Sequence, residues 1–204
     1  MNDKELSRLI EKNSSAEKQS ISTETGLKAV IQIIPIAEKN DVEWMLAGGI
    51  AMHLYGFVRA TVDVDVIASK TLPLESQTRL SFGGESYKAE ADSRSVTVDW
   101  IVRDDEYQEF YESSLQDAVR ADNGLRIISP EWMVILKYLA VRAKDKLDLI
   151  WLLQAENLVN RDLVKNHLRK VLGEKASLFV FREFQSEFDY ADLLKVRENN
   201  SKYD

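Results

Sequence analysis

The chain has 204 residues, of which 45% are hydrophobic, and its formal net charge is −7. A chain of this length and hydrophobic content suits one domain, or one domain with a helical annex. The absence of cysteine excludes disulfides, thiolate metal sites and cysteine nucleophiles. The negative charge argues against a broad basic surface for nucleic acid and leaves room for a local basic patch. The polar N-terminus lacks a signal-peptide core, and no apolar run reaches the roughly 20 residues of a membrane helix. We therefore expect a soluble, cytoplasmic protein without a membrane partner.

The first third of the chain alternates between helical and strand patterns. Residues 1–25 are polar and predict an arm. Residues 26–40 predict a helix that Pro35 kinks or restarts, because apolar residues recur at helical spacing; they are Leu27, Val30, Ile31, Ile34 and Ala37. A strand, a Gly-Gly turn, a short helix and a second strand are predicted next, at 42–47, Gly48–Gly49, 50–55 and 61–68.

The middle of the chain continues with strands, and the last third is helical. Gly83–Gly84 predicts a hairpin, and Asp122-Asn123-Gly124 predicts another hairpin turn. Between and after them we expect a strand at 95–102, a helix at 104–113 and a strand at 125–128. Ser129-Pro130-Glu131 is typical of a helix start, with an N-cap, a proline and an acid in order. Four helices are expected from there, at 130–143, 145–156, 160–172 and 174–188.

These patterns predict an α/β (α+β) fold: a small mixed sheet with a helical C-terminal region. The expected organisation is a polar arm at 1–25, a core at 26–128 and a helical region at 129–204.

Two acids mark the strand Asp63-Val64-Asp65-Val66. Successive side chains of a strand alternate faces, so the valines enter a core and both aspartates point to the other face, about 7 Å apart at Cα. Paired carboxylates repel each other unless a cation neutralises them, and Mg²⁺ prefers such oxygen ligands. The alternative is an ordinary exposed strand face that carries two acids.

Two further features favour a site. Gly48–Gly49, between a strand and a helix, permits close approach of a ligand, and the helix start offers N–H groups to a phosphate; a bare turn is the alternative. Asp99 is a lone acid in an apolar strand, so it requires a metal or a partner such as a local arginine.

Gly48–Gly49, then thirteen residues, then Asp63-Val64-Asp65-Val66 resembles the signature of the DNA polymerase β-like nucleotidyltransferase superfamily. Asp99 is similar to the third carboxylate of that family, on a neighbouring strand. The resemblance implies a nucleotidyltransferase core and transfer of a nucleoside monophosphate from an NTP to a hydroxyl group. It also implies two Mg²⁺ ions held by Asp63, Asp65 and Asp99, with Gly48 and Gly49 on the phosphates.

A narrower resemblance lies in Met133-Val134-Ile135-Leu136-Lys137 and Arg142-Ala143-Lys144-Asp145. These segments, the second of which continues through Lys146-Leu147-Asp148, are similar to the AbiEii-type branch, the nucleotidyltransferase toxins of abortive-infection toxin–antitoxin pairs. The likeness implies that Lys137 contacts the triphosphate and that Asp145 is a catalytic or orienting group beside it. Lys144 or Arg142 would assist phosphate binding. The alternative is a solvated helix face with Lys–Asp pairs, Asp148 included.

Arg59 and the two histidines are further candidates. Arg59 either binds the triphosphate or pairs with an aspartate. His53 is expected to pack or to make a local hydrogen bond, and His167 to lie on the surface. We expect the tryptophans in the core, and neither a zinc site nor nucleophilic catalysis is indicated.

The predicted function is a Mg²⁺- and NTP-dependent nucleotidyltransferase, with tRNA, a protein or a small molecule all open as acceptor. The alternatives are a catalytically silent nucleotide-binding or protein-interaction module on the same fold, and a component that binds a cognate antitoxin or toxin.

Overall fold

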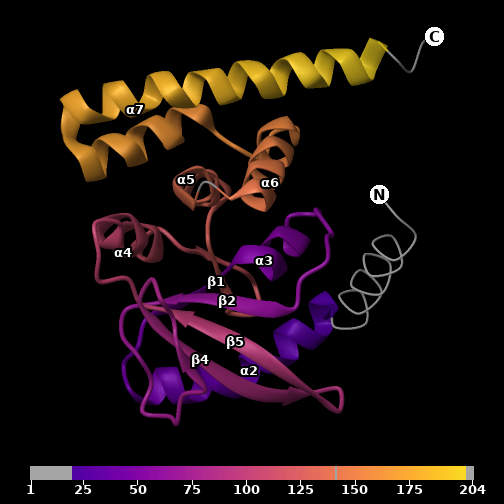
Figure 1. Ribbon diagram of the computed structural model, residues 1–204, viewed down its shortest axis with the longest axis vertical. Coiled ribbons are helices and arrows are strands. Elements are labelled where there is room, and N and C mark those ends of the chain that lie inside the picture. Colours follow the sequence, from indigo (N-terminus) through magenta and orange to yellow (C-terminus); the bar gives the residue numbers. More distant parts are fainter. Residues whose placement is uncertain (1–19, 141, 201–204) are drawn as a thin grey trace, which may run out of the picture. The chain divides into compact units, whose positions relative to one another are not determined.

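A computed structural model describes residues 20–140 and 142–200, with only the backbone for 198–200. Most of the predicted arm, residues 1–19, lies outside the described residues, as does the extreme C-terminus. The chain forms two compact units. The N-terminal unit extends to Gln108 and includes Arg120–Ile127, and the C-terminal unit comprises Glu109–Val119 and the chain from Ile128 onward. The predicted α/β fold with a mixed sheet is confirmed (Figure 1).

The N-terminal unit is built on a seven-stranded mixed sheet in the order β3-β4-β5-β2-β1-β7-β6. The central pair β2 and β5 is parallel, as is β1 with β7, whereas β1–β2, β4–β5 and β3–β4 are antiparallel. The strands are β1 (Trp44–Ala47), β2 (Asp63–Ala68), β3 (Thr78–Arg79), β4 (Gly84–Ala91), β5 (Arg94–Ile101), β6 (Val119–Arg120) and β7 (Arg126–Ile127).

One face of this sheet is the core of the unit. Val64, Val66 and Val98 are fully buried on it, and helix α2 (Thr23–Lys39) packs on β2, β4 and β5. Helix α3 (Gly48–Leu54) lies on β1 and β2 and also contacts α2. Because side chains alternate along a strand, the residues between these valines project to the opposite face.

The start of α2 differs from the prediction. Ser22 is the N-cap, and its side chain accepts a hydrogen bond from Thr25 N, so the helix begins three residues before the predicted Gly26. The helix continues through Pro35. Its buried apolar residues are Ala29, Val30, Ile33 and Ala37. Ile31, a predicted core position, is 60% exposed. Ile31 lies near the polar face of the helix, where the exposed residues Glu24, Lys28 and Gln32 recur at four-residue spacing.

The regular structure of the C-terminal unit is helical, apart from Val119 at the start of β6. Its helices are α4 (Gln108–Gln116), α5 (Pro130–Ala140), α6 (Ala143–Gln154) and α7 (Arg161–Asn200). Gly173, with φ +75° and ψ 173°, breaks α7 where the sequence predicted a boundary between two helices, but the second part continues beyond the predicted end at 188. Helix α4 begins later than the predicted 104, because Asp105 instead binds Arg103 and Tyr107 N. No helix among the described residues is long and apolar enough to cross a membrane.

Candidate active site

Three carboxylates share one face of the sheet. Asp65 on β2 is the register partner of Asp99 on the parallel strand β5, so their Cα atoms are about 4.8 Å apart. Asp63 precedes Asp65 by two residues and therefore points to the same face. All three side chains are half-buried, unlike the fully buried valines of the opposite face. The arrangement places three acids from two adjacent strands on one small area.

The Gly48–Gly49 turn fits closely against this face. Gly48 has φ +58°, and a Cβ atom there would lie 1.7 Å from Asp65 Oδ2. A Cβ atom on Gly49 would lie 2.5 Å from Thr61 Oγ1. Both positions therefore require glycine, the first for its backbone conformation and both for space. The turn brings the backbone directly onto the Asp65 carboxylate and the Thr61 hydroxyl.

Two hydroxyl groups bind the outer carboxylates. Ser86 Oγ on β4 donates to Asp99 Oδ1 at 2.6 Å, and Thr61 Oγ1 lies 3.3 Å from Asp63 Oδ1. Ser86 is the register partner of Asp99, so one row of residues crosses five strands; from β1 to β3 it comprises Ala47, Asp65, Asp99, Ser86 and Thr78. Neither Ser86 nor a role for Thr61 was predicted from the sequence. Strand order and register are needed to find Ser86.

The carboxylate chemistry suits a hard divalent cation, since all the ligand atoms are oxygen. As the side chains stand, however, no group of three or more His, Cys, Asp or Glu residues in the described part of the chain is arranged to hold a metal ion. Asp99 is turned toward Ser86 and Asp63 toward Thr61. The backbone register thus allows a shared ion, and joint coordination requires rotation of these carboxylates.

His53, near the end of α3, contacts Arg59 in the loop that leads into β2. His53 is 9% exposed. Its Nε2 lies 2.6 Å from Arg59 O and 3.3 Å from Arg59 N; the shorter contact indicates that Nε2–H donates to the carbonyl. Nδ1 then accepts from Thr23 Oγ1 at 3.0 Å. The predicted local hydrogen bond of His53 is confirmed, and it fixes the backbone of Arg59, which lies four residues before Asp63.

Lys137, Asp145 and Asp148 form a buried ion cluster between α5 and α6 in the C-terminal unit. Lys137 Nζ lies 2.7 Å from Asp145 Oδ1 and 2.6 Å from Asp148 Oδ2. Both aspartate side chains are fully buried and Lys137 is 9% exposed, so the predicted alternative of a solvated helix face is wrong for these residues. The exposed Arg142 reaches the second oxygen of Asp145 at 2.5 Å. These four side chains join the two helices.

The charge state of Asp145 follows from this cluster. Burial raises the pKa of Asp145, but hydrogen bonds from Arg142 and Lys137 outweigh it, and the pKa lies below its usual value. Asp145 therefore remains ionised and neutralises its partners. Lys144, the predicted phosphate-binding neighbour, is exposed.

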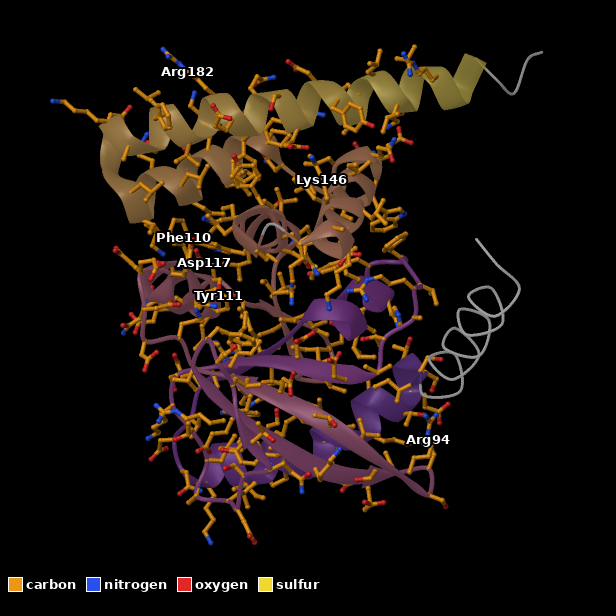
Figure 2. All side chains as sticks on the ribbon, in the orientation of Figure 1. Arg94, Phe110, Tyr111, Asp117, Lys146 and Arg182 are labelled. Carbon is orange, nitrogen blue, oxygen red and sulfur yellow. The ribbon has the colours of Figure 1, made fainter. Side chains whose placement is uncertain are left out.

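His167 is half-buried and not on the surface as predicted. Its ring stacks on Trp132 with centroids 4.6 Å apart, and its Nδ1 lies 3.5 Å from Asp117 Oδ2. Asp117, which directly follows α4 and is labelled in Figure 2, also accepts a hydrogen bond from Trp132 Nε1 at 3.0 Å. Burial lowers the pKa of His167, and the carboxylates of Asp117 and Glu131 oppose that shift only in part. The amphipathic pattern of the helix did not reveal that Trp132 covers this histidine.

No protein-family model and no curated protein matches the chain. Among solved structures it is similar to an antigenic nucleotidyltransferase-like protein from Paracoccidioides brasiliensis, with 17% identity over 81% of this chain and 91% of the other, and a TM-score of 0.43. It is also similar to the antibiotic-resistance factor ANT(2'')-Ia, with 16% identity over 87% of this chain and all of the other (100%), and a TM-score of 0.36. Both scores lie below 0.5, so the function has to be argued from the residues of this chain.

Proposed function

We propose that this protein is a Mg²⁺-dependent nucleotidyltransferase that transfers a nucleoside monophosphate from an NTP to a hydroxyl acceptor. The observation that supports it is the register of Asp65 with Asp99, with Asp63 on the same face and the Gly48–Gly49 turn directly above Asp65. Carboxylates on one side and close-lying backbone on the other are what a metal-bound triphosphate requires.

Each carboxylate has a distinct part in the proposed site. Asp63 and Asp65 would hold both ions, and Asp99 would complete the second site beside the acceptor hydroxyl. Bound Mg²⁺ supplies charge neutralisation at the transferring and leaving phosphates. The acceptor oxygen would bond to the α-phosphorus, the bond from the α-phosphorus to the oxygen bridging to the β-phosphate would break, and pyrophosphate would leave with that oxygen, while the Asp99 carboxylate would take the acceptor proton.

The surrounding residues complete the proposal. Gly48, Gly49 and Arg59 would bind the phosphates. The nucleotide contact of Lys137, Asp145 and Lys144 stays a prediction, since Lys137 and Asp145 have a structural task in the ion cluster. A toxin–antitoxin role likewise stays a prediction, which co-purification of a partner from the native host would test.

One observation favours the alternative of a catalytically silent nucleotide-binding or protein-interaction module. In the described part of the chain the acids do not form a ready three-ligand cluster, and Ser86 holds Asp99. A silent nucleotide-binding module differs from the enzyme in turnover, and a protein-interaction module differs from it in nucleotide binding as well.

Thermal shift with each of the four NTPs, with and without Mg²⁺, tests the nucleotide site first. We expect Mg²⁺-dependent stabilisation by an NTP in the wild type and its loss in Asp63→Asn/Asp65→Asn, because asparagine keeps the shape and removes the charge. Labelled-NTP transfer to candidate acceptors follows. Asp99→Ala should abolish transfer and keep part of the NTP binding. Normal turnover by this variant excludes the proposed role of Asp99, and Mg²⁺-dependent binding without transfer to any tRNA, protein or small molecule supports the silent module.

A further inference from the structure

The part of α7 that follows Gly173 has an apolar face that the described residues leave uncovered. This part runs back along the first part of the helix (Figure 1) and packs through its other side. There the rings of Phe184 and Tyr138 have centroids 4.2 Å apart, and Phe188 is buried. Five of the twelve large apolar side chains that are exposed among the described residues lie on the uncovered face; they are Leu178, Phe179, Tyr190, Leu193 and Val196.

These side chains belong to a continuous stripe along the helix. At about 100° per residue they point to the side opposite Phe184 and Phe188. Exposed residues follow one another on this side at alternating intervals of three and four; they are Phe179, Arg182, Ser186, Asp189, Leu193 and Val196. That spacing is the one by which two helices pair along a seam. Single exposed apolar side chains are common on soluble proteins, whereas a contiguous apolar stripe marks a contact surface.

The apolar residues of the stripe are arranged symmetrically about Ser186. Phe179 precedes Ser186 by seven residues, and Leu193 follows it by seven. A second copy that lies antiparallel, with the two-fold axis beside Ser186, therefore places Phe179 of each chain against Leu193 of the other. Ser186 permits close approach of the helices because it is small. Its hydroxyl already donates to Glu183 O at 2.6 Å and requires no partner from the second copy.

The charges of the stripe are complementary in the same arrangement. Arg182, which is exposed and labelled in Figure 2, precedes Ser186 by four residues, and Asp189 and Tyr190 follow it by three and four. Across the axis the guanidinium of each copy meets the carboxylate and the aromatic ring of the other, which gives two ion pairs and two cation–π contacts. A parallel copy would instead bring Arg182 to Arg182 and Asp189 to Asp189. The charges therefore favour an antiparallel pair.

We propose that this face of α7 joins two copies of the chain in an antiparallel dimer whose two-fold axis passes beside Ser186. The stripe is complementary to itself, whereas the net charge of −7 gives two whole chains no general attraction. The contact extends from Leu178 to Val196, over about 27 Å of helix. It ends where Lys175 and Arg197, each eleven residues from Ser186, bring like charges together. The dimer goes beyond the proposed function and does not rest on it.

Sedimentation velocity of the full chain over a concentration series measures the dimer. We expect Phe179→Glu and Leu193→Glu each to weaken it about a hundredfold, because each places a charge in the apolar contact. Leu147→Glu, at a 66% exposed position on α6, is the matched control and should dimerise as the wild type does. A wild type that stays monomeric overturns the proposal and leaves the face to a different partner. A dimer of unchanged affinity in both glutamate variants overturns this face as its interface.

Charge exchange tests the pairing across the axis. Arg182→Asp alone and Asp189→Arg alone should each weaken the dimer about tenfold, because like charges then meet. The double variant Arg182→Asp/Asp189→Arg should restore the affinity, since the ion pairs form again with their partners exchanged. A double variant as weak as the sum of the two single losses overturns the proposed pairing.

Disulfide formation gives a further readout, because the chain has no cysteine of its own. Ser186→Cys should cross-link two copies on mild oxidation, since the axis brings the two positions together. Lys175→Cys should not, because the two positions lie about 33 Å apart along antiparallel helices. In a parallel pair both variants would cross-link. Cross-linking of Lys175→Cys, or none of Ser186→Cys, overturns the antiparallel arrangement.

Discussion

Replacement of Gly48 by alanine should affect stability and the proposed site together. Left-handed backbone at φ +58° costs an alanine about 1–2 kcal/mol. The new Cβ would also lie 1.7 Å from Asp65 Oδ2. Relief of that overlap displaces the carboxylate or the turn, and overpacking of this kind costs about 1–3 kcal/mol. We therefore expect Gly48→Ala to lower the free energy of unfolding by about 2–5 kcal/mol.

Gly124 offers a matched control. It has φ +83°, and a Cβ atom there would meet nothing within 4 Å, so Gly124→Ala carries the backbone cost alone. Urea unfolding of both variants measures the difference, which isolates the contact with Asp65 at about 1–3 kcal/mol. Thermal shift with Mg²⁺ and NTP should be lost in Gly48→Ala and retained in Gly124→Ala. Equal losses of stability in the two variants would refute the reasoning that Asp65 requires glycine at this position.

Three further predictions concern the C-terminal unit. Lys137→Met should lower the free energy of unfolding, measured in urea, by about 3–5 kcal/mol, because it leaves two buried carboxylates without their cation. Lys28→Met removes an exposed ion pair and should change this free energy little. Similar losses in the two variants would contradict the argument. The pKa of Asp145 is lowered below 3.8, so the ionised carboxylate contributes to stability above that pH, and this contribution is lost as the pH falls through the lowered pKa. Asp145→Asn should remove this part of the acid dependence of the unfolding midpoint. The pKa of His167 is lowered below 6.5, so the unfolded chain binds the proton more tightly and stability declines as the pH falls below about 6.5. His167→Gln should flatten that decline between pH 6.5 and 5, and an unchanged profile would show that another group causes it.

The strands of the site could be read from the sequence because their patterns are local. Val64 and Val66 alternate with Asp63 and Asp65, and this alternation fixes which residues share a face wherever the strand lies. The sequence also predicted the hairpins at Gly83–Gly84 and Gly124, because glycine patterns of this kind are local turn signals. All three glycines have positive φ in the structure. Helix ends were less accurate: the capping by Ser22 moved α2 earlier, and the hydrogen bonds of Asp105 moved α4 later.

What the sequence by itself determined is the content of the elements: which segments are strands, which are helices, and that two aspartates of one strand point the same way. Only the tertiary structure decided that β5 pairs in parallel with β2, so that Asp99 lies opposite Asp65 with Ser86 behind it. It also decided that Lys137 is buried between Asp145 and Asp148. The physical reason is the separation along the sequence of the residues that interact. Side-chain alternation and capping depend on neighbours along the chain, whereas strand order, register and the burial of a charge depend on residues far apart in the sequence.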